Sequence, residues 1–391
     1  MYKILFVVPD FYPSTTGFAN ASVGLVNSIL KYGQGKYEIH VLAETKLNNE
    51  QKEFEGAVVH RYVRSKFDNR FTHSVIERAK YRHAVKLIDK VSFDLIFFET
   101  NTFPIFENLI VKRYKDKVCV RIHSTADTEV AVYGLDANLF QKRMKKKMFD
   151  FMNDVHGVIA TSDFYLEFVK KHFYESNVYK IWCSRHFGLI FNTCQDQFKS
   201  FDQPSDNLFL TMGKLSNNGL VQKGFIDLLN SIEFLSINKK LPNDFKLVMI
   251  GDGEKFDFLK SYLETLDIRD RVVLVKKASH DDVFDYISKS KAIILLSRYE
   301  GQSMFITETI SMGKPIIVTS NNGMSNMILD NQNGYSVEPG DILSISNAIY
   351  KMVNLDNDSL QQMGMKSREL FLQKFSEKAV YDQFEFFIKT C

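Results

Sequence analysis

Short apolar runs alternate with amphipathic stretches along almost the whole chain. Each run is four to six residues long, which is typical of a strand buried on both faces. The runs occupy residues 4–8, 38–42, 95–98, 117–122, 155–160, 208–212, 246–250, 272–275, 292–296 and 316–319. Between them, apolar positions recur with helical spacing, as at residues 19–30, 74–90 and 377–389. The alternation predicts an α/β protein with parallel sheets covered on both faces.

The length of the chain, 391 residues, is sufficient for two α/β domains with separate cores. Residues 198–207, FKSFDQPSDN, are polar and contain a proline, which is typical of a linker. We therefore predict one domain over residues 1–200 and a second over residues 201–372. Residues 373–391 follow as a terminal helical segment.

Composition and charge exclude several classes of protein. Hydrophobic residues make up 45% and charged residues 25%, as in ordinary soluble globular proteins. The net charge of +3 gives no general reason to expect nucleic acid as a partner. No apolar stretch approaches about 20 residues, and the first strand begins at once without a leader, so we expect a cytoplasmic protein.

The four cysteines are scattered at positions 119, 183, 194 and 391, without a CxxC pair. No histidine cluster has the sequence spacing of a metal site, so we expect reduced thiols and no zinc.

The segment from Ser297 to Gly340 carries the strongest chemical pattern. Glu300 follows the apolar run 292–296, and Glu308 comes eight positions later, inside a predicted helix over residues 302–312. Eight helical residues rise roughly 12 Å, which is about the length of a diphosphate linkage. A helix N-terminus between the two acids favours phosphate. The pattern predicts a nucleotide-sugar site, with one acid for sugar hydroxyls and the other for ribose hydroxyls.

This segment resembles the signature of the GT-B glycosyltransferases of family 4, whose hallmark is two glutamates with seven residues between them. The resemblance continues through Met312-Gly313-Lys314-Pro315, Asn333-Gly334 and Pro339-Gly340-Asp341. It implies a GT-B fold, that is, two Rossmann-like, doubly wound parallel-sheet domains facing a central cleft. The N-terminal domain would be on the acceptor side and the C-terminal domain would bind the nucleotide sugar. The terminal helix would cross back to the N-terminal domain through Tyr381, Phe384 and Phe387.

The resemblance also implies roles for individual residues in the C-terminal domain. Glu300 would hold sugar hydroxyls and Glu308 the ribose. Lys223 matches a phosphate-binding lysine of the family, and Lys214, after Gly213, replaces its usual arginine. The backbone amides near the phosphate or sugar would be those of Ser303, Met304 and Phe305. No metal ligand is implied.

Three further positions bear on the prediction. His123 directly follows the run 117–122, at the strand end where family members place a histidine that reaches the donor sugar. Gly17 lies in the loop after the first strand, where it either approaches the donor phosphate or meets the conformational needs of a tight turn. Asn326 stands where many members have another glutamate. We interpret His280 as part of a helix start, His280-Asp281-Asp282.

The densest basic run is residues 140–153, FQKRMKKKMFDFMN. As a helix it would have a cationic and an apolar side. It would either dock on anionic lipid at the inner face of the cell membrane or be a solvated helix packed on the sheet.

The resemblance therefore implies a retaining, metal-independent hexosyltransferase that uses a nucleotide-diphosphate sugar, UDP-linked, and no cofactor. The acceptor would be a glycan, a glycolipid or a protein-linked saccharide. Two alternatives stay open. One is a GT-B epimerase or phosphorylase, and the other is a non-catalytic GT-B partner of an active transferase.

Overall fold

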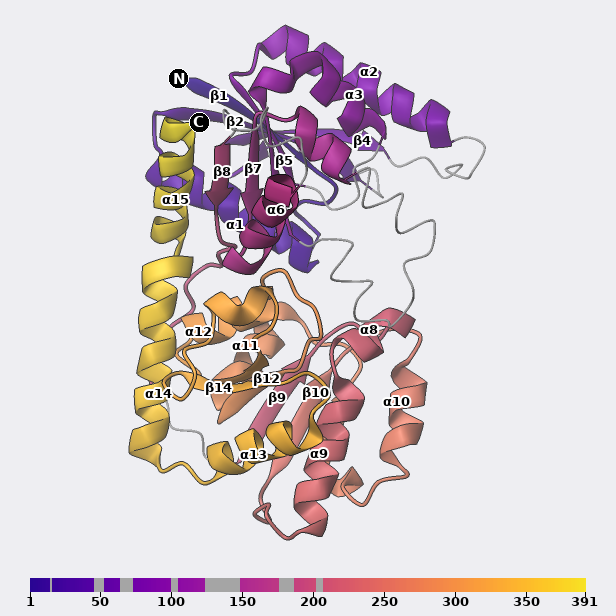
Figure 1. Cartoon of the computed structure of the whole chain (residues 1–391), viewed down its shortest axis with the longest axis vertical. Coiled ribbons are helices and arrows are strands. Elements are labelled where there is room, and N and C mark those ends of the chain that lie inside the picture. The colour runs from indigo at the N-terminus through magenta and orange to yellow at the C-terminus, as the bar shows by residue number, and fades with distance from the viewer. Residues whose placement is uncertain are drawn as a thin grey trace. The chain divides into compact units, whose positions relative to one another are not determined.

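The computed structural model describes residues 1–14, 16–45, 53–63, 73–99, 105–123, 148–175, 186–201 and 207–391. The chain divides into two compact units (Figure 1). The N-terminal unit comprises Met1–Cys194 together with Glu377–Cys391, and the C-terminal unit comprises Gln195–Ser376.

The N-terminal unit is built on an eight-stranded sheet with the strand order β3-β4-β2-β1-β5-β6-β7-β8. All neighbouring strands are parallel except β3 and β4. The strands are β1 (Tyr2–Val8), β2 (Tyr37–Thr45), β3 (Glu53–Phe54), β4 (Ala57–Val63), β5 (Leu95–Glu99), β6 (Val118–Ile122), β7 (Gly157–Ala160) and β8 (His186–Leu189). The helical elements include α1 (Gly17–Tyr32), α2 (His73–Val91), α3 (Ile105–Tyr114), η1 (Lys115–Lys117), α6 (Asp163–Glu175) and α15 (Glu377–Thr390).

The central strands β5 and β6 are buried at every position, so helices cover both faces of the sheet, as the apolar runs predict. The pattern did not reveal β3, β4 and β8. In β4, buried Ala57 and Val59 alternate with exposed Val58, and β8 is only partly buried. Strands near the edge of a sheet bury fewer side chains and therefore have a weaker apolar signal.

The C-terminal unit has a six-stranded parallel sheet with the order β11-β10-β9-β12-β13-β14. Its strands are β9 (Leu208–Met212), β10 (Lys246–Ile250), β11 (Val272–Val275), β12 (Ala292–Leu295), β13 (Ile316–Thr319) and β14 (Gly334–Val337). Its α-helices are α8 (Asn217–Gln222), α9 (Phe225–Ile237), α10 (Phe256–Leu263), α11 (His280–Lys289), α12 (Met304–Ser311), α13 (Ile342–Val353) and α14 (Asn357–Leu370). Short turns are η2 (Arg269–Arg271), η3 (Gly323–Asn326) and the π-helical η4 (Phe371–Phe375).

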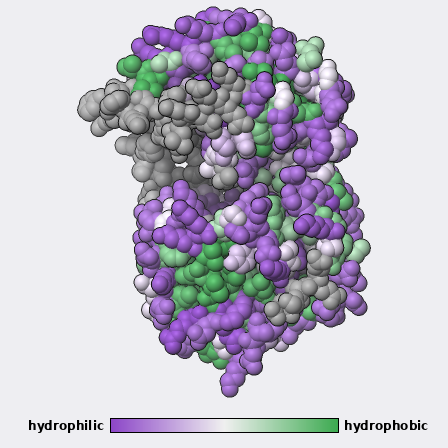
Figure 2. Space-filling model, turned by 180° about the vertical axis from the view of Figure 1, so that it is seen from behind, coloured by the Kyte–Doolittle hydropathy of each residue, from purple (hydrophilic) through white to green (hydrophobic). Residues whose placement is uncertain are grey.

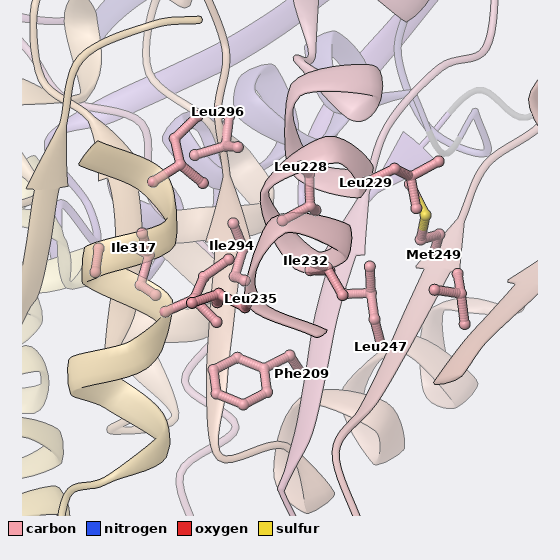
Figure 3. Close-up of a cluster of buried hydrophobic side chains, with 14 of the residues drawn as sticks. Phe209, Leu228, Leu229, Ile232, Leu235, Leu247, Met249, Ile294, Leu296 and Ile317 are labelled. Atoms are coloured by element: carbon pink, nitrogen blue, oxygen red, sulfur yellow. The ribbon is translucent and has the colours of Figure 1, made fainter. Parts of the chain in front are cut away.

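One face of this sheet forms a core with α9 (Figure 3). Leu228, Leu229 and Ile232 on the helix belong to this core together with Phe209 and Ile294 of the strands, and all are almost fully buried. This core supports the carboxyl ends of β9 and β12, which begin the candidate site.

Residues 216–222 contain glycine and asparagine, a composition from which we predict a loop. The structure corrects this prediction, because residues 217–222 form the helix α8. Ser216 caps it by accepting a hydrogen bond from the backbone N–H of Gly219 at 3.0 Å. A side-chain cap and the packing of Leu220 stabilise a short helix that its residue propensities disfavour.

Helix α15 belongs to the N-terminal unit although it is last in the chain. Phe384 contacts the rings of Tyr37 and Phe97, with centroids 5.7 and 6.3 Å away. A Cβ added at Gly157 or Gly188 would lie 2.7 or 2.4 Å from the ring of Phe387, so the two glycines leave room for that ring. Tyr381 is also buried. The terminal helix therefore packs through the three aromatic residues singled out in the sequence.

The face of the molecule in Figure 2 is mostly hydrophilic, with smaller apolar areas. Among the helices of the described residues, none combines the length and apolar character needed to cross a bilayer.

Candidate active site

The candidate site of the C-terminal unit lies where the sheet changes its winding direction. From β9 the chain adds β10 and β11 on one side, and it then returns to add β12, β13 and β14 on the other. Ligands of doubly wound sheets bind at this switch point, outside the carboxyl ends of the strands. The loops after β9 and β12 carry the residues singled out in the sequence.

Lys223 and Glu300 form an ion pair at this edge. The Lys223 Nζ lies 2.5 Å from Glu300 Oε2, and the hydroxyl of Ser297 donates to the same oxygen at 3.1 Å. Both charged side chains are 16% exposed, so the pair is shielded yet reachable by a ligand. A Cβ added at Gly213 would lie 2.9 Å from Cγ of Lys223. The glycine after β9 therefore gives the lysine stem its path toward Glu300.

Backbone contacts fix the loop that carries Glu300. The N–H of Arg298 donates to the carbonyl of Gln222 at 2.8 Å, and its guanidinium pairs with Asp227 at 2.6 Å. Gly224, between α8 and α9, has φ 64°. A Cβ there would lie 2.7 Å from the carbonyl oxygen of Leu296, so this position needs glycine for conformation and for space.

The turn after β13 also holds the loop. The N–H of Gly323 donates to the carbonyl oxygen of Glu300 at 2.9 Å. A Cβ at Gly323 would lie 1.4 Å from the carbonyl oxygen of Gly301. The close approach of the two backbones fixes the start of the segment leading to α12.

Helix α12 begins at the switch point and carries the second glutamate. Ser303 caps it by accepting a hydrogen bond from the N–H of Ile306 at 3.3 Å. Ser303 and Phe305 are buried, and Met304 is partly buried. The free N–H groups of such a first turn and the positive end of the helix dipole favour an anion.

Glu308 is 4% exposed, and its Oε1 lies 3.0 Å from Nε2 of His280. The hydrogen bond that His280 donates to Glu308 raises the pKa of the histidine, although burial opposes this. Ser279 and Asp282 form a capping box at the start of α11 and thereby set the direction of the histidine.

His280 is the site residue that sequence reasoning missed, because we assigned it only to a helix start. The helix start itself is correct, but Ser279 rather than His280 is its cap. Its position could have indicated a role, because His280 comes shortly after the strand β11, and residues that follow parallel strands meet at the carboxyl edge of the sheet.

A second cluster lies at the carboxyl ends of β5 and β6 in the N-terminal unit. The Nε2 of His123 is 2.5 Å from one oxygen of Glu99, and Arg121 donates to the other at 2.7 Å. Burial raises the pKa of Glu99, but Arg121 and His123 outweigh it, so the net shift is downward. Burial lowers the pKa of His123 against the opposing effect of Glu99. The ring of Phe18, next to Gly17, contacts His123 at 4.6 Å between centroids.

The structure decides between the two interpretations of Gly17 in one respect. Gly17 begins α1, which Thr16 caps, and its φ is not in the left-handed region. A Cβ there would meet nothing within 4 Å. The tight-turn explanation is therefore wrong, because a larger residue would fit. Space for a ligand is compatible with this opening, and the donor-binding role stays a prediction.

Two other positions singled out in the sequence are Lys214 and Asn326, and neither is fully buried. The side chain of Lys214 is exposed, and Asn326 is partly exposed within η3.

The basic residues at 142, 143 and 145–147 lie outside the described residues. Residues 148–154 are helical, and Met148, Phe149 and Phe151 of this helix belong to the core of the N-terminal unit.

Comparison with known proteins identifies the C-terminal unit. Residues 194–370 match the family model described as glycosyl transferases group 1. The chain is 28% identical to N-acetyl-alpha-D-glucosaminyl L-malate synthase of Bacillus anthracis over 142 residues, and this match covers 36% of each protein. It is 26% identical to poly(ribitol-phosphate) alpha-N-acetylglucosaminyltransferase of Staphylococcus aureus over 244 residues, and this match covers 62% of the chain and 45% of that protein. The matches thus span less than half the length of these relatives.

Solved structures resemble the chain over its whole length. A glycosyltransferase from Rickettsia africae superposes with a TM-score of 0.70 at 17% identity, covering 99% of this chain and 98% of that one. Anabaena HepE, solved with UDP and glucose, has a TM-score of 0.71 at 14% identity and full coverage of both chains. At such identity the likeness concerns the fold alone.

The two parallel-sheet units and these neighbours define a GT-B protein, which confirms the predicted fold class. Within it, residues 194–370 are a glycosyl transferases group 1 domain, and the predicted family 4 is consistent with the names of the relatives.

Proposed function

We propose that this protein is a glycosyltransferase that moves a hexosyl group from a UDP-linked sugar to a saccharide or lipid-linked acceptor with retention at the anomeric carbon. One observation carries the proposal. Two glutamates flank the first turn of α12, and each is held by a cationic or protonatable side chain, Lys223 at Glu300 and His280 at Glu308. The arrangement offers a carboxylate to each end of a diphosphate linkage and a helix N-terminus between them.

The ribose end of the donor would bind Glu308. A buried carboxylate that accepts one hydrogen bond from His280 has further lone pairs for ribose hydroxyls. At the other end, Glu300 would accept hydrogen bonds from sugar hydroxyls while Lys223 turns toward the phosphate. Each charged hydrogen bond of this kind contributes about 1.5–3 kcal/mol.

The reaction would break the bond between the anomeric carbon and a diphosphate oxygen, with the electron pair passing to the diphosphate. The acceptor oxygen would bond to the anomeric carbon on the same face, and its proton would pass to the leaving diphosphate. Lys223, the first turn of α12 and Lys214 would stabilise the charge that grows on that group. His123 would orient the sugar from the N-terminal unit, and Glu99 would fix the direction of its ring. We propose that no metal ion takes part.

The choice of UDP is supported by the HepE neighbour, solved with UDP and glucose. Transfer of a hexosyl group is supported by the Staphylococcus aureus relative, which is named for transfer of N-acetylglucosamine. A polymeric acceptor agrees with the name of the Staphylococcus aureus relative, which specifies poly(ribitol-phosphate). Peripheral contact of residues 140–153 with the inner face of the cell membrane stays a prediction.

The first experiment is calorimetric titration with UDP, GDP and ADP in the presence of a chelator. We expect UDP to bind, and Glu308→Gln to weaken the binding by about 1–3 kcal/mol, or roughly 5- to 150-fold. Glu264→Gln, at an exposed position after α10, is the control and should bind UDP like the unmodified protein. If a folded protein bound none of the nucleotides, the donor site would be disproved and the non-catalytic partner would become the better explanation.

The second experiment follows UDP release from UDP-sugars with and without saccharide acceptors. Lys223→Met and Glu300→Gln should lower the rate at least about 100-fold. Lys260→Met, at an exposed position of α10, should leave the rate unchanged. The anomeric configuration of the product, read by NMR, tests retention. Isomerised donor, or sugar transfer to inorganic phosphate, would instead favour the epimerase or phosphorylase alternative.

A further inference from the structure

A cluster of metal-binding side chains lies in the N-terminal unit at the amino-terminal edge of its sheet. His156 directly precedes β7, and His186 is the first residue of the neighbouring strand β8. Gly157 and His186 are register partners, so the two histidines stand side by side. Their ring centroids are 5.4 Å apart. Cys391, which follows α15, completes the group.

The donor atoms are close enough for one ion. One nitrogen of each histidine and the Sγ of Cys391 all lie within 4.8 Å of one another. In a tetrahedral zinc site, bond lengths of about 2.0–2.3 Å correspond to ligand separations of roughly 3.3–3.8 Å. Small side-chain rotations can close the difference. The three residues are neither fully buried nor fully exposed, so an ion can reach them and remain partly shielded from water.

A second thiol lies next to the three ligands. The Sγ of Cys119, on β6, is 3.9 Å from the Sγ of Cys391. The backbone carbonyl of Cys391 lies 3.3 Å from Nε2 of His156. A Cβ added at Gly157 would be 2.9 Å from Cys119 Sγ and 3.5 Å from Cys391 Sγ. These contacts hold Cys391 in place, and such outer contacts orient metal ligands in known sites.

We propose that His156, His186 and Cys391 form a binding site for a thiophilic divalent cation, and that the preferred ion is Zn²⁺. Two imidazoles and one thiolate are ligands that zinc prefers, whereas Mg²⁺ and Ca²⁺ prefer oxygen. Binding would release the thiol proton of Cys391, and the histidines would bind as neutral rings.

The role of the ion would be structural. Cys391 is bonded through its N–H to the carbonyl of Phe387, at the end of α15. An ion bound by Cys391 and by the histidines at the starts of β7 and β8 would therefore fasten α15 to the sheet. His123 and Glu99 lie at the carboxyl ends of the strands, the opposite edge, so the site is separate from the proposed catalytic chemistry.

Sequence spacing gives no sign of this cluster, which is why we expected no zinc site. The ligands are separated by 30 residues (156 to 186) and 205 residues (186 to 391), far beyond the short spacings of known zinc motifs. Only the pairing of β7 with β8 and the packing of α15 bring them together.

The test uses the full chain, reduced and stripped of metal with a chelator that is then removed. Titration with Co²⁺, an optical substitute for Zn²⁺, should give one ion per chain with a sulfur-to-cobalt charge-transfer band and the intense visible bands of tetrahedral coordination. Zn²⁺ should displace it and abolish the bands. Zn²⁺ should also raise the melting temperature of the unmodified protein in proportion to the logarithm of its concentration.

His186→Ala and Cys391→Ser should each weaken binding at least ~10-fold and abolish the thermal effect. Cys194→Ser removes a cysteine of the same unit that is not part of the cluster, and it should change neither the metal affinity nor the thermal effect. The proposal would be overturned by the absence of stoichiometric Co²⁺ binding to the reduced, folded chain. Equal binding by the unmodified protein and both ligand variants would overturn it as well. UDP binding, measured in parallel, keeps this result independent of the proposed transferase activity.

Discussion

Substitution of Glu99 by glutamine tests the buried cluster around His123. Glu99 and Arg121 are both fully buried, and the carboxylate contacts Arg121 and His123 through different oxygens. The guanidinium also donates to the carbonyl of Ile190 at 3.2 Å and to the side chain of Asn192. Glu99→Gln keeps the shape of the side chain but removes the negative charge, so Arg121 becomes a buried cation without a counter-ion.

Breaking a buried ion pair by removing one partner costs about 3–5 kcal/mol. The amide oxygen of glutamine still accepts a hydrogen bond, which returns about 1 kcal/mol. We therefore expect Glu99→Gln to lower the free energy of unfolding of the N-terminal unit by about 2–4 kcal/mol. For a unit of this size that corresponds to roughly 4–16 °C in melting temperature.

Scanning calorimetry of the full chain measures this shift, and Glu167→Gln is the control. Glu167 also pairs with a cation, Lys170, but its side chain is 71% exposed, so its loss should cost at most about 1 kcal/mol. UDP binding by the C-terminal unit should be retained in both variants. Equal melting temperatures for the two variants would refute the reasoning, because burial would then not govern the energy of the pair.

Three further predictions concern stability. The His280→Gln variant should be less stable than the unmodified protein at low pH, and this difference in the free energy of unfolding should become smaller as pH rises. The raised pKa of His280 means that its pairing with Glu308 is complete below the unfolded value of 6.5 and is lost as pH passes the folded value, which urea unfolding at a series of pH values would show. Gly224→Ala should lower the free energy of unfolding by about 2–4 kcal/mol through backbone strain and overlap, whereas Gly17→Ala should change it by less than about 1 kcal/mol; equal effects in calorimetry would contradict this. Phe387→Ala should cost about 3–5 kcal/mol, because its ring is buried at the end of α15, and a loss below about 1 kcal/mol would show that the helix is not held there.

Much of the fold could be predicted from the sequence, because its signals are local. The apolar runs at residues 208–212 and 272–275 have the same bounds as β9 and β11. Central strands are buried on both faces and must be apolar throughout, so the pattern reveals them. Strands β3, β4, β8 and β14 escaped prediction, and all four lie at or next to an edge of a sheet, where a continuous apolar pattern is not required.

The same distinction between local signals and distant contacts applies to the candidate site. Sequence alone shows which residue types occur at strand ends and helix starts, since the spacing of Glu300 and Glu308 depends only on one loop and one helix. The partners of these two glutamates depend on the tertiary structure. Lys223 is 77 residues from Glu300, and His280 is 28 residues from Glu308. Each pair meets because the strand order places distant loops at one edge of the sheet. Hydrophobic period and capping are properties of neighbouring residues, whereas the meeting of distant side chains depends on how strands pair and helices pack.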